Sequence, residues 1–221
     1  MNRTKAKPNY YYPVFLNIQG KYCVVIGGGD VALRKVKMLL EGGAVITVIS
    51  PTFHPDLVQL FKEKTIQLIH RDYQHGDLEN AMMAIIATNI QERNRRVAQE
   101  ARDQGILVNV VDDPEGSDYI LPSFFRRGNL TIAISTRGAS PALAKKIRIE
   151  LEQKFGEDFS QLLNLVEEVR STLRSRQIHV APDVWQEALD LDKLIGLVRS
   201  GRMDEAKAIL LSRLEATPKE K

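Results

Sequence analysis

Three consecutive glycines, Gly27 to Gly29, follow a short apolar run and precede a helical pattern. The spacing Gly27-x-Gly29-x-x-Ala32 is typical of a dinucleotide-binding loop, in which the first glycine allows a tight turn and the second lets the backbone approach a pyrophosphate. Free N–H groups and the helix dipole at the helix start favour a phosphate there. The sequence therefore predicts nucleotide binding at this loop, with a purely structural turn as the alternative.

The residues after the second apolar run indicate which dinucleotide to expect. A loop of this kind is usually followed, about 20 positions on, by an acidic residue that binds the ribose hydroxyls. Here the run ends in Ser50, Pro51 and Thr52, so two hydroxyls stand where a carboxylate is expected. No arginine is close by to bind a 2′-phosphate, and Asp56 would repel one. The sequence therefore predicts NAD rather than NADP.

A carboxylate follows the last apolar run of the same region. Asp112 comes directly after Val110 and Val111 and begins the turn-rich stretch "DDPEGSD". Ligands of an open α/β sheet bind beyond the carboxyl ends of the strands, so Asp112 is a candidate proton acceptor beside the cofactor. From the residues alone, the simpler interpretation is stronger: Asp112 and Asp113 only begin a turn before Pro114.

Alternating strand and helix patterns must position these residues. Apolar, β-branched runs are typical of strands that are covered on both faces, and helical patterns separate them. This alternation predicts an α/β fold with a Rossmann-like parallel sheet. The predicted strands cover residues 21–27, 44–50, 66–73, 81–88 and 106–112.

The pattern changes after Asp113. Residues 119–136 indicate two antiparallel strands joined through Arg127, Gly128 and Asn129. A helix is expected next, with Ser140 as its N-cap and Pro141 at its first position. Helical patterns then fill the rest of the chain, with one break near "HVAPDV".

Composition narrows the class of protein. The net charge of +3 over 221 residues is too small to argue for nucleic acid, but it is compatible with an anionic small molecule. The single cysteine, Cys23, excludes a disulfide framework, and the four histidines lack metal-ligand spacing and are expected on the surface or in loops. No apolar stretch reaches the roughly 18 residues of a membrane span, and the first residues lack a signal-peptide core. We therefore expect a cytoplasmic protein that binds neither nucleic acid nor membrane.

Several motifs, in order along the chain, resemble the precorrin-2 dehydrogenase family, the siroheme-synthase NAD-binding module. They lie between about Tyr12 and Lys154 and include "YCVVIGGGDVALRKV", "AIIATN", "VNVVDDPEGSDYILPS" and "ISTRGASPALAKKIRIELE". The resemblance implies an oxidoreductase of porphyrin and siroheme biosynthesis, which oxidises precorrin-2, a reduced polycarboxylate tetrapyrrole, to sirohydrochlorin with NAD. Some members are also ferrochelatases, a lyase activity that takes Fe²⁺ as a substrate. The sequence leaves open whether this chain shares that activity and which metal is physiological.

The resemblance also implies roles for single residues. The essential aspartate of the family's "NVVD" motif is matched by Asp112, the expected catalytic residue. Arginine side chains are suited to binding the carboxylates of the substrate. For each arginine taken singly, a solvated charge on the protein surface is an equally good interpretation. No permanent metal site is expected. The expected cofactor-binding residues are Gly27, Gly29, Asp30, Val31, Ser50, Pro51, Thr52 and Thr88, and the expected substrate-binding residues are Asn109, Ser123, Arg126 and Arg137.

Members of the family are homodimers, and the resemblance implies that the β insert and the helical part make the interface. The chain is therefore expected to have three parts. We expect a NAD-binding Rossmann domain over 1–113, a β dimerisation region over 114–147 and a helical C-terminal domain over 148–221. A second interpretation, from a different class, is a non-catalytic NAD(H)-sensing module whose helical tail contacts a partner. Asp112 distinguishes the two, because a sensor has no need of a base at a strand end.

Overall fold

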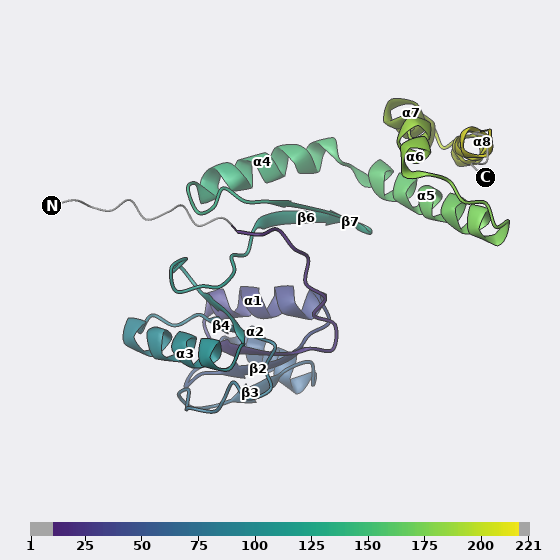
Figure 1. The fold of residues 1–221 in the computed structure, drawn as a ribbon. Coiled ribbons are helices and arrows are strands. Elements are labelled where there is room, and N and C mark those ends of the chain that lie inside the picture. Colours follow the sequence, from purple (N-terminus) through teal and green to yellow (C-terminus); the bar gives the residue numbers. More distant parts are fainter. Residues whose placement is uncertain (1–10, 217–221) are drawn as a thin grey trace. The chain divides into compact units, whose positions relative to one another are not determined.

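The computed structural model describes residues 11–216, and the chain divides into two compact units between Leu121 and Pro122. Each unit has its own secondary structure (Figure 1). The three-part division expected from the sequence is finer than this and stays a prediction.

The first unit is built on a five-stranded sheet whose pairs are all parallel. The strand order is β3-β2-β1-β4-β5, so the chain runs outward on one side of β1 and then restarts on the other side. This reversal between β1 and β4 is the point at which doubly wound sheets bind their ligands. The strands are β1 (Tyr22–Ile26), β2 (Val45–Ile49), β3 (Gln67–Ile69), β4 (Met83–Ile86) and β5 (Leu107–Val110).

Helices cover both faces of this sheet. Along β1, Cys23 and Val25 belong to one core cluster, and Val24 and Ile26 belong to the other. Burial on both faces explains the continuous apolar runs of the sequence and confirms the predicted fold class. Burial also raises the pKa of the Cys23 thiol to about 11, so this thiol stays neutral. The first cluster includes residues of α1 (Asp30–Glu41) and α2 (Pro55–Lys62), and the second includes residues of α3 (Gln91–Asp103).

Strand β3 is shorter than predicted. The sequence pattern extended it to residue 73, but the strand ends at Ile69. The guanidinium of Arg71 instead contacts both carboxylate oxygens of Asp77 at 2.7 Å, and the Gln74 N–H donates to the same carboxylate at 2.7 Å. These side-chain bonds fold residues 71–77 into a loop, which the apolar pattern could not indicate.

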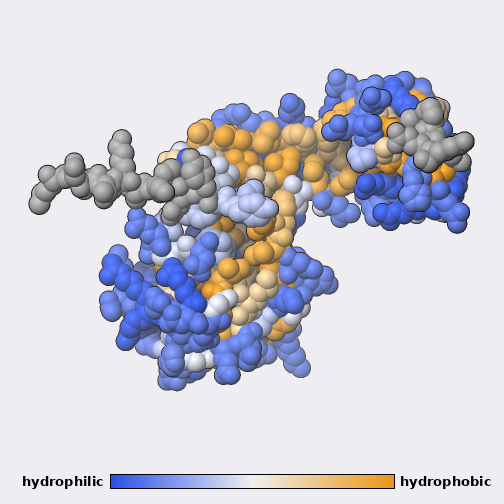
Figure 2. Space-filling view, in the orientation of Figure 1, coloured by the Kyte–Doolittle hydropathy of each residue, from blue (hydrophilic) through white to orange (hydrophobic). Residues whose placement is uncertain are grey.

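The second unit begins with an antiparallel pair, β6 (Ser123–Arg127) and β7 (Leu130–Ile134), followed by α4 (Pro141–Lys154). The Leu143 N–H donates to Ser140 Oγ at 3.1 Å, which confirms the predicted N-cap. Apolar residues lie on the surface of this β–α segment in Figure 2. Within the segment, only Phe125 and Ala144 are buried among the described hydrophobic residues.

Four further helices share a separate core of buried leucine, valine and isoleucine side chains. The sequence pattern predicted one break in this region, and that was wrong, because there are three. Asp190 caps a new helix by accepting from the Lys193 N–H at 3.2 Å, and Gly201, with φ +73°, follows the end of that helix. No helix within residues 11–216 combines the length and apolar character that a membrane span requires. The four helices are α5 (Glu157–Ser175), α6 (Pro182–Ala188), α7 (Leu191–Arg199) and α8 (Met203–Glu215).

Candidate functional site

Two of the three loop glycines are required by packing. Gly27 has φ +117°, and a Cβ added there would lie 2.3 Å from the carbonyl oxygen of Ala87, just after β4. A Cβ on Gly28 would lie 1.9 Å from the carbonyl oxygen of Thr52, just after β2. The glycine loop therefore lies directly against the ends of the two strands beside β1. Gly28 was absent from the predicted site, although the run of three glycines was a signal for it.

Gly29 differs from its two neighbours. It is the N-cap of α1, its φ of −85° suits any residue, and an added Cβ would meet nothing within 4 Å. It has no side chain that could cap the first N–H groups of the helix, which have no partner within the helix either. Asp30 and Val31 follow in the first turn, with the Asp30 side chain 89% exposed. Open space above uncapped N–H groups fits the pyrophosphate of a dinucleotide.

The loop after β2 is fixed against the glycine loop. Ser50 is buried, and its Oγ accepts from the Thr52 N–H at 3.4 Å. The carbonyl oxygen of Pro51 lies 2.6 Å from His70 Nε2, and the His54 N–H donates to the carbonyl oxygen of Gly28 at 2.7 Å. Ser50, Pro51 and Thr52 therefore lie beside the glycine loop, where the sequence placed the ribose-binding residues.

His54 is a residue of this region that sequence reasoning assigned only to a surface or loop. Its Nδ1 accepts from the Asp56 N–H at 3.1 Å, which caps α2. Because Nδ1 accepts, the neutral ring carries its proton on Nε2, which lies 3.4 Å from the carboxylate of Asp30. His54 thus connects the start of α2 to the start of α1. Pro55 was the available signal, because proline favours the first position of a helix and so marks the residue before it as the cap.

Thr88 lies at the carboxyl end of β4 and is half-buried. Its hydroxyl donates to Asn94 Oδ1, and Asn94 Nδ2 donates back to the Thr88 carbonyl at 2.8 Å. These bonds connect the end of β4 to the first turns of α3. The contact between Thr88 and a cofactor stays a prediction.

Asp112 lies in the loop that leaves β5, at the carboxyl edge of the sheet, and it is exposed. Its φ of +60° is in the left-handed region, which aspartate visits more readily than most residues but still at a cost. Asn109 lies three residues earlier, within β5. It is buried and donates from Nδ2 to the carbonyl oxygen of Tyr119 at 2.9 Å. Asn109 therefore fixes the far end of this loop, and its contact with a substrate stays a prediction.

Side-chain bonds hold the loop that carries Asp112. Ser117 Oγ accepts from the Val110 N–H at 2.8 Å and donates to the Asp113 carbonyl at 2.7 Å, and Asp113 Oδ1 accepts from the Gly116 N–H at 2.9 Å. The backbone of residues 113–118 is thereby folded back on β5. The sequence showed only that this stretch was turn-rich.

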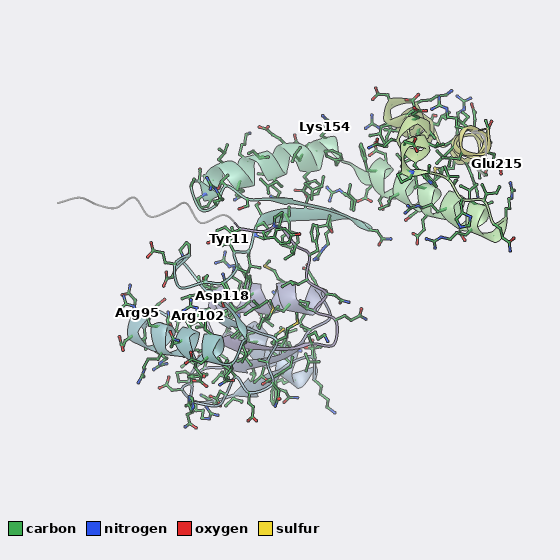
Figure 3. The ribbon with its side chains drawn as sticks, in the orientation of Figure 1. Tyr11, Arg95, Arg102, Asp118, Lys154 and Glu215 are labelled. Atoms are coloured by element: carbon green, nitrogen blue, oxygen red, sulfur yellow. The ribbon has the colours of Figure 1, made fainter. Side chains whose placement is uncertain are left out.

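Asp118 completes the attachment of the loop. Its carboxylate accepts from the Val108 N–H at 3.0 Å and from Arg102 Nε at 3.1 Å, and the labelled side chains of Arg102 and Asp118 lie together in Figure 3. The Asp118 N–H also donates to the Val108 carbonyl at 2.8 Å. Asp112 is therefore presented from a loop whose two ends are both held by β5.

The remaining predicted substrate residues belong to the second unit. Ser123 is half-buried at the start of β6. Arg126 is exposed, with its Cζ 5.0 Å from the centroid of the Phe124 ring. Arg137 is exposed in a left-handed turn, where its N–H donates to Ser135 Oγ at 3.1 Å. Their contact with a substrate stays a prediction.

Other basic residues of the second unit have acidic partners inside it. Arg127 and Arg148 both contact the carboxylate of Glu152. Lys146 lies 3.7 Å from Glu150 on the same helix. The carboxylates of the same unit therefore partly neutralise these three cations. Within residues 11–216 there is no group of three or more His, Cys, Asp or Glu side chains that could hold a metal ion.

Comparison with known families agrees with this geometry. Residues 14–123 match the family described as "Putative NAD(P)-binding", and residues 127–154 match the family described as "Sirohaem biosynthesis protein central". The siroheme synthase of Pseudoalteromonas translucida is 36% identical over 208 residues, which cover 93% of this chain and 44% of that protein. The siroheme synthase of Thioalkalivibrio sulfidiphilus is 34% identical over 207 residues, which cover 93% of this chain and 42% of that protein. The chain thus spans less than half the length of these curated relatives.

A solved structure matches the whole fold. The protein named "SirC, precorrin-2 dehydrogenase" superimposes with a TM-score of 0.69 at 28% sequence identity, and the match covers 94% of this chain and 100% of that one. The similarity therefore includes both units and not only the dinucleotide-binding sheet. Together with the two family matches in sequence order, it shows that the chain belongs to the family of the siroheme-synthase NAD(P)-binding module.

Proposed function

We propose that this protein is a precorrin-2 dehydrogenase that uses NAD and forms sirohydrochlorin on the route to siroheme. One observation carries the proposal. The uncapped helix start at Gly29 and the exposed carboxylate of Asp112 both lie at the carboxyl edge of the same parallel sheet. The names of the similar proteins, siroheme synthase and precorrin-2 dehydrogenase, support the same substrate class.

Dehydrogenation of precorrin-2 removes one hydride and one proton from the macrocycle. NAD, when bound, supplies the acceptor for the hydride. The N–H groups after Gly29 would hold its pyrophosphate, and the loop Ser50 to Thr52 would face the adenosine ribose. The carboxylate of Asp112 would accept the proton as a general base, and the bonds that fix its loop would keep it at the edge of the sheet.

Charges at the glycine loop favour NAD over NADP in this proposal. The carboxylates of Asp30 and Asp56 lie on either side of His54, at 3.4 and 3.9 Å from its ring nitrogens. A 2′-phosphate here would be repelled by both. Lys37 lies 3.4 Å from Asp56 and is therefore already paired with a carboxylate. It is not an unpaired cation that could attract a 2′-phosphate.

The polycarboxylate substrate requires cations and hydrogen-bond donors. We assign this role to Arg126 and Arg137, with Asn109 and Ser123 as polar contacts. Arginine suits it because the planar guanidinium can donate two parallel hydrogen bonds to one carboxylate.

A homodimer is part of the same proposal. Of the 14 residues of α4 only Ala144 is buried, while Leu143 is 52% exposed. A two-stranded sheet is marginal in water by itself, so β6, β7 and α4 need a further surface to cover them. A second copy of the chain would supply it. We place the protein in the cytoplasm, where NAD and tetrapyrrole intermediates are available.

Insertion of Fe²⁺ into sirohydrochlorin is a second activity to test. The observation that favours it is the name of the relatives, which refers to siroheme, the iron-containing product. Asp112 could then also accept the pyrrole protons that leave as the metal enters. Iron would be a substrate here, so a permanent metal cage is not required.

The decisive experiment compares the wild-type protein with Asp112→Asn. Asparagine tolerates the left-handed backbone at this position but cannot accept the proton. Under anaerobic conditions with precorrin-2 and NAD, the variant should form NADH about 10²–10⁴-fold more slowly, while calorimetry finds its NAD affinity unchanged. Glu115→Gln removes a charge from the same loop and should keep wild-type activity. Ferrous iron is added after oxidation is complete.

Two results would contradict the proposal. Near-normal NADH formation by Asp112→Asn would remove Asp112 as the base. A wild-type protein that binds NAD but leaves precorrin-2 unchanged would favour the non-catalytic NAD(H)-sensing module instead.

A further inference from the structure

Asn94 is a buried asparagine on the apolar face of α3. The other buried residues of this helix are Val97, Ala98 and Ala101, which belong to the core cluster on that face of the sheet. Asparagine is a poor helix former, and a buried amide costs free energy unless its polar atoms are bonded. For folding alone, an apolar side chain would suit this position. The hydrogen bonds of Asn94 therefore indicate what the residue is for.

Both ends of the Asn94 amide are bonded to Thr88, the second residue after β4. Nδ2 donates to the Thr88 carbonyl oxygen at 2.8 Å, and a carbonyl can only accept, so Oδ1 is the end that meets the Thr88 hydroxyl. An amide oxygen can only accept as well. The Thr88 hydroxyl therefore donates its one hydrogen to Asn94 and cannot donate to any other group.

The Thr88 hydroxyl oxygen keeps one lone pair for a ligand. A hydroxyl oxygen can accept two bonds, and within residues 11–216 the one further bond to this oxygen is a long one, 3.4 Å from the Ile90 N–H. The Thr88 residue is only half-buried. Its hydroxyl can therefore accept from a donor on a ligand, but it has no hydrogen to offer to a phosphate oxygen.

The place of Thr88 on the sheet indicates which donor this is. The chain just before it approaches the glycine loop so closely that a Cβ on Gly27 would lie 2.3 Å from the Ala87 carbonyl oxygen. Strand β4 lies between β1 and β5, on the opposite side of β1 from β2 and the loop Ser50 to Thr52. A dinucleotide with its pyrophosphate at the glycine loop and its adenosine over β2 would place its second ribose, which is joined directly to the pyrophosphate, beside Thr88.

We infer that Thr88 accepts a hydrogen bond from a hydroxyl of the nicotinamide ribose, and that Asn94 is the positioning residue that holds the Thr88 oxygen in this acceptor state. The inference rests on the proposed function, because it takes NAD as the ligand of the glycine loop. It gives a reason for a buried asparagine in α3. It also predicts that a ligand without the second ribose does not use Thr88.

Calorimetry with two fragments of the cofactor tests the ribose contact without any activity. ADP ends at the pyrophosphate, whereas ADP-ribose also carries the second ribose. Thr88→Val keeps the shape of threonine but has no hydroxyl, so it should bind ADP-ribose and NAD roughly 3- to 10-fold more weakly, the effect of one lost hydrogen bond. Its affinity for ADP should equal that of the wild type. Thr88→Ser restores the hydroxyl and should restore most of the affinity.

A double variant tests the role of Asn94. Asn94→Leu should weaken ADP-ribose binding roughly 2- to 10-fold, because ordering the freed Thr88 side chain now costs part of the binding energy. Its ADP affinity should be unchanged. Adding Asn94→Leu to Thr88→Val should cause no further loss, because a residue that acts through the hydroxyl has no effect once the hydroxyl is absent. Asn94→Ala takes the place of Asn94→Leu if thermal denaturation shows that the leucine variant is unfolded.

Gln99→Ala is the matched control for this series. It removes another amide of α3, one that donates to Asp103 Oδ1 at 2.8 Å on the exposed side of the helix. This variant should bind ADP, ADP-ribose and NAD as the wild type does.

Several results would overturn the inference. Unchanged ADP-ribose affinity in Thr88→Val would remove the ribose contact, and a loss seen with NAD but not with ADP-ribose would move the contact to the carboxamide. Equal weakening of ADP and ADP-ribose would show a general disturbance of the loop. A further loss in the double variant would show that Asn94 acts by another route.

The same titrations separate the inference from the proposed function. A wild-type protein that binds NAD and ADP-ribose but does not oxidise precorrin-2 would contradict only the dehydrogenase, and the variants would still decide the role of Asn94. A wild-type protein that binds neither nucleotide would contradict both.

Discussion

Gly27 and Gly29 are two positions apart in the same loop, but a side chain would have opposite effects at the two sites. At Gly27 a Cβ would lie 2.3 Å from a backbone oxygen, and φ is +117°. At Gly29 the same atom would enter open space. The fold therefore requires the first glycine but not the second, and contact of Gly29 with a pyrophosphate stays a prediction.

This contrast predicts different defects for Gly27→Ala and Gly29→Ser. Alanine at position 27 should lower the free energy of unfolding by about 1–3 kcal/mol or more, because the backbone conformation is strained for any residue with a Cβ. Serine at position 29 can cap the first turn of α1, so the melting temperature should be unchanged or higher. Its hydroxyl would occupy the N–H groups that a pyrophosphate needs, so NAD affinity should fall at least about tenfold.

Calorimetry and thermal denaturation of both variants separate these effects. If Gly29→Ser binds NAD as tightly as the wild type, the open space at the start of α1 is not the pyrophosphate site. If Gly27→Ala keeps wild-type stability, the close approach to Ala87 is relieved by movement of the loop.

At the scale of elements, specific polar bonds hold two of the connections between strands. The loop after β5 is attached through Ser117 and Asp118, and the loop after β3 is attached through Arg71 and Asp77. Both loops fold by bonds between a carboxylate or hydroxyl and nearby backbone N–H groups. The first of them presents Asp112, and the second ends β3 early.

The Arg71–Asp77 pair predicts a pH-dependent stability. The Arg71 guanidinium, together with the Gln74 N–H, holds the pKa of Asp77 below its usual range in spite of partial burial. A carboxyl whose pKa is lower in the folded state stabilises the fold above its unfolded pKa of about 4, and that stabilisation disappears as the pH falls through the folded pKa. Asp77→Asn should therefore lower stability at pH 6 and make the decline between pH 5 and pH 2 shallower.

Urea denaturation of the two proteins across this pH range measures the effect. The two stability curves should converge at the acidic end, where Asp77 is protonated in the wild type. Curves that stay parallel from pH 6 to pH 2 would show that Asp77 contributes nothing to acid sensitivity.

At the scale of the whole molecule, the buried side chains are unevenly distributed. The sheet has a core cluster on each face, and helices α5 to α8 share a third cluster. The segment formed by β6, β7 and α4 has only Phe125 and Ala144 buried. A segment with so little core of its own is the part of the molecule that gains most from a second chain.

The proposed homodimer predicts a difference between two equally exposed leucines. Leu143 of α4 and Leu191 of α7 are each 52% exposed. Leu143→Asp should shift the protein from dimer to monomer, because a second copy would bury this position against an unpaired charge. Leu191→Asp should leave the dimer intact. Sedimentation velocity at several concentrations distinguishes the two, and a Leu143→Asp variant that stays dimeric would place the interface elsewhere.

The sequence by itself determined the features that depend on local pattern. Apolar runs predicted the parallel strands, the spacing of Gly27 and Gly29 predicted the loop before α1, and Ser140 predicted a helix cap. It also placed Asp112 at the end of a strand. These features follow from periodicity and turn chemistry, which act over a few neighbouring residues and can therefore be recognised along the chain.

Only the tertiary structure decided the features that join distant residues. The packing of Gly28 against Thr52 and the approach of His54 to Asp30 each connect positions that are 24 residues apart. No local pattern specifies such pairs, because they arise when the strand order brings separate strand ends to one edge of the sheet. The order β3-β2-β1-β4-β5 is therefore what turns a glycine loop and a turn-forming aspartate into one candidate site.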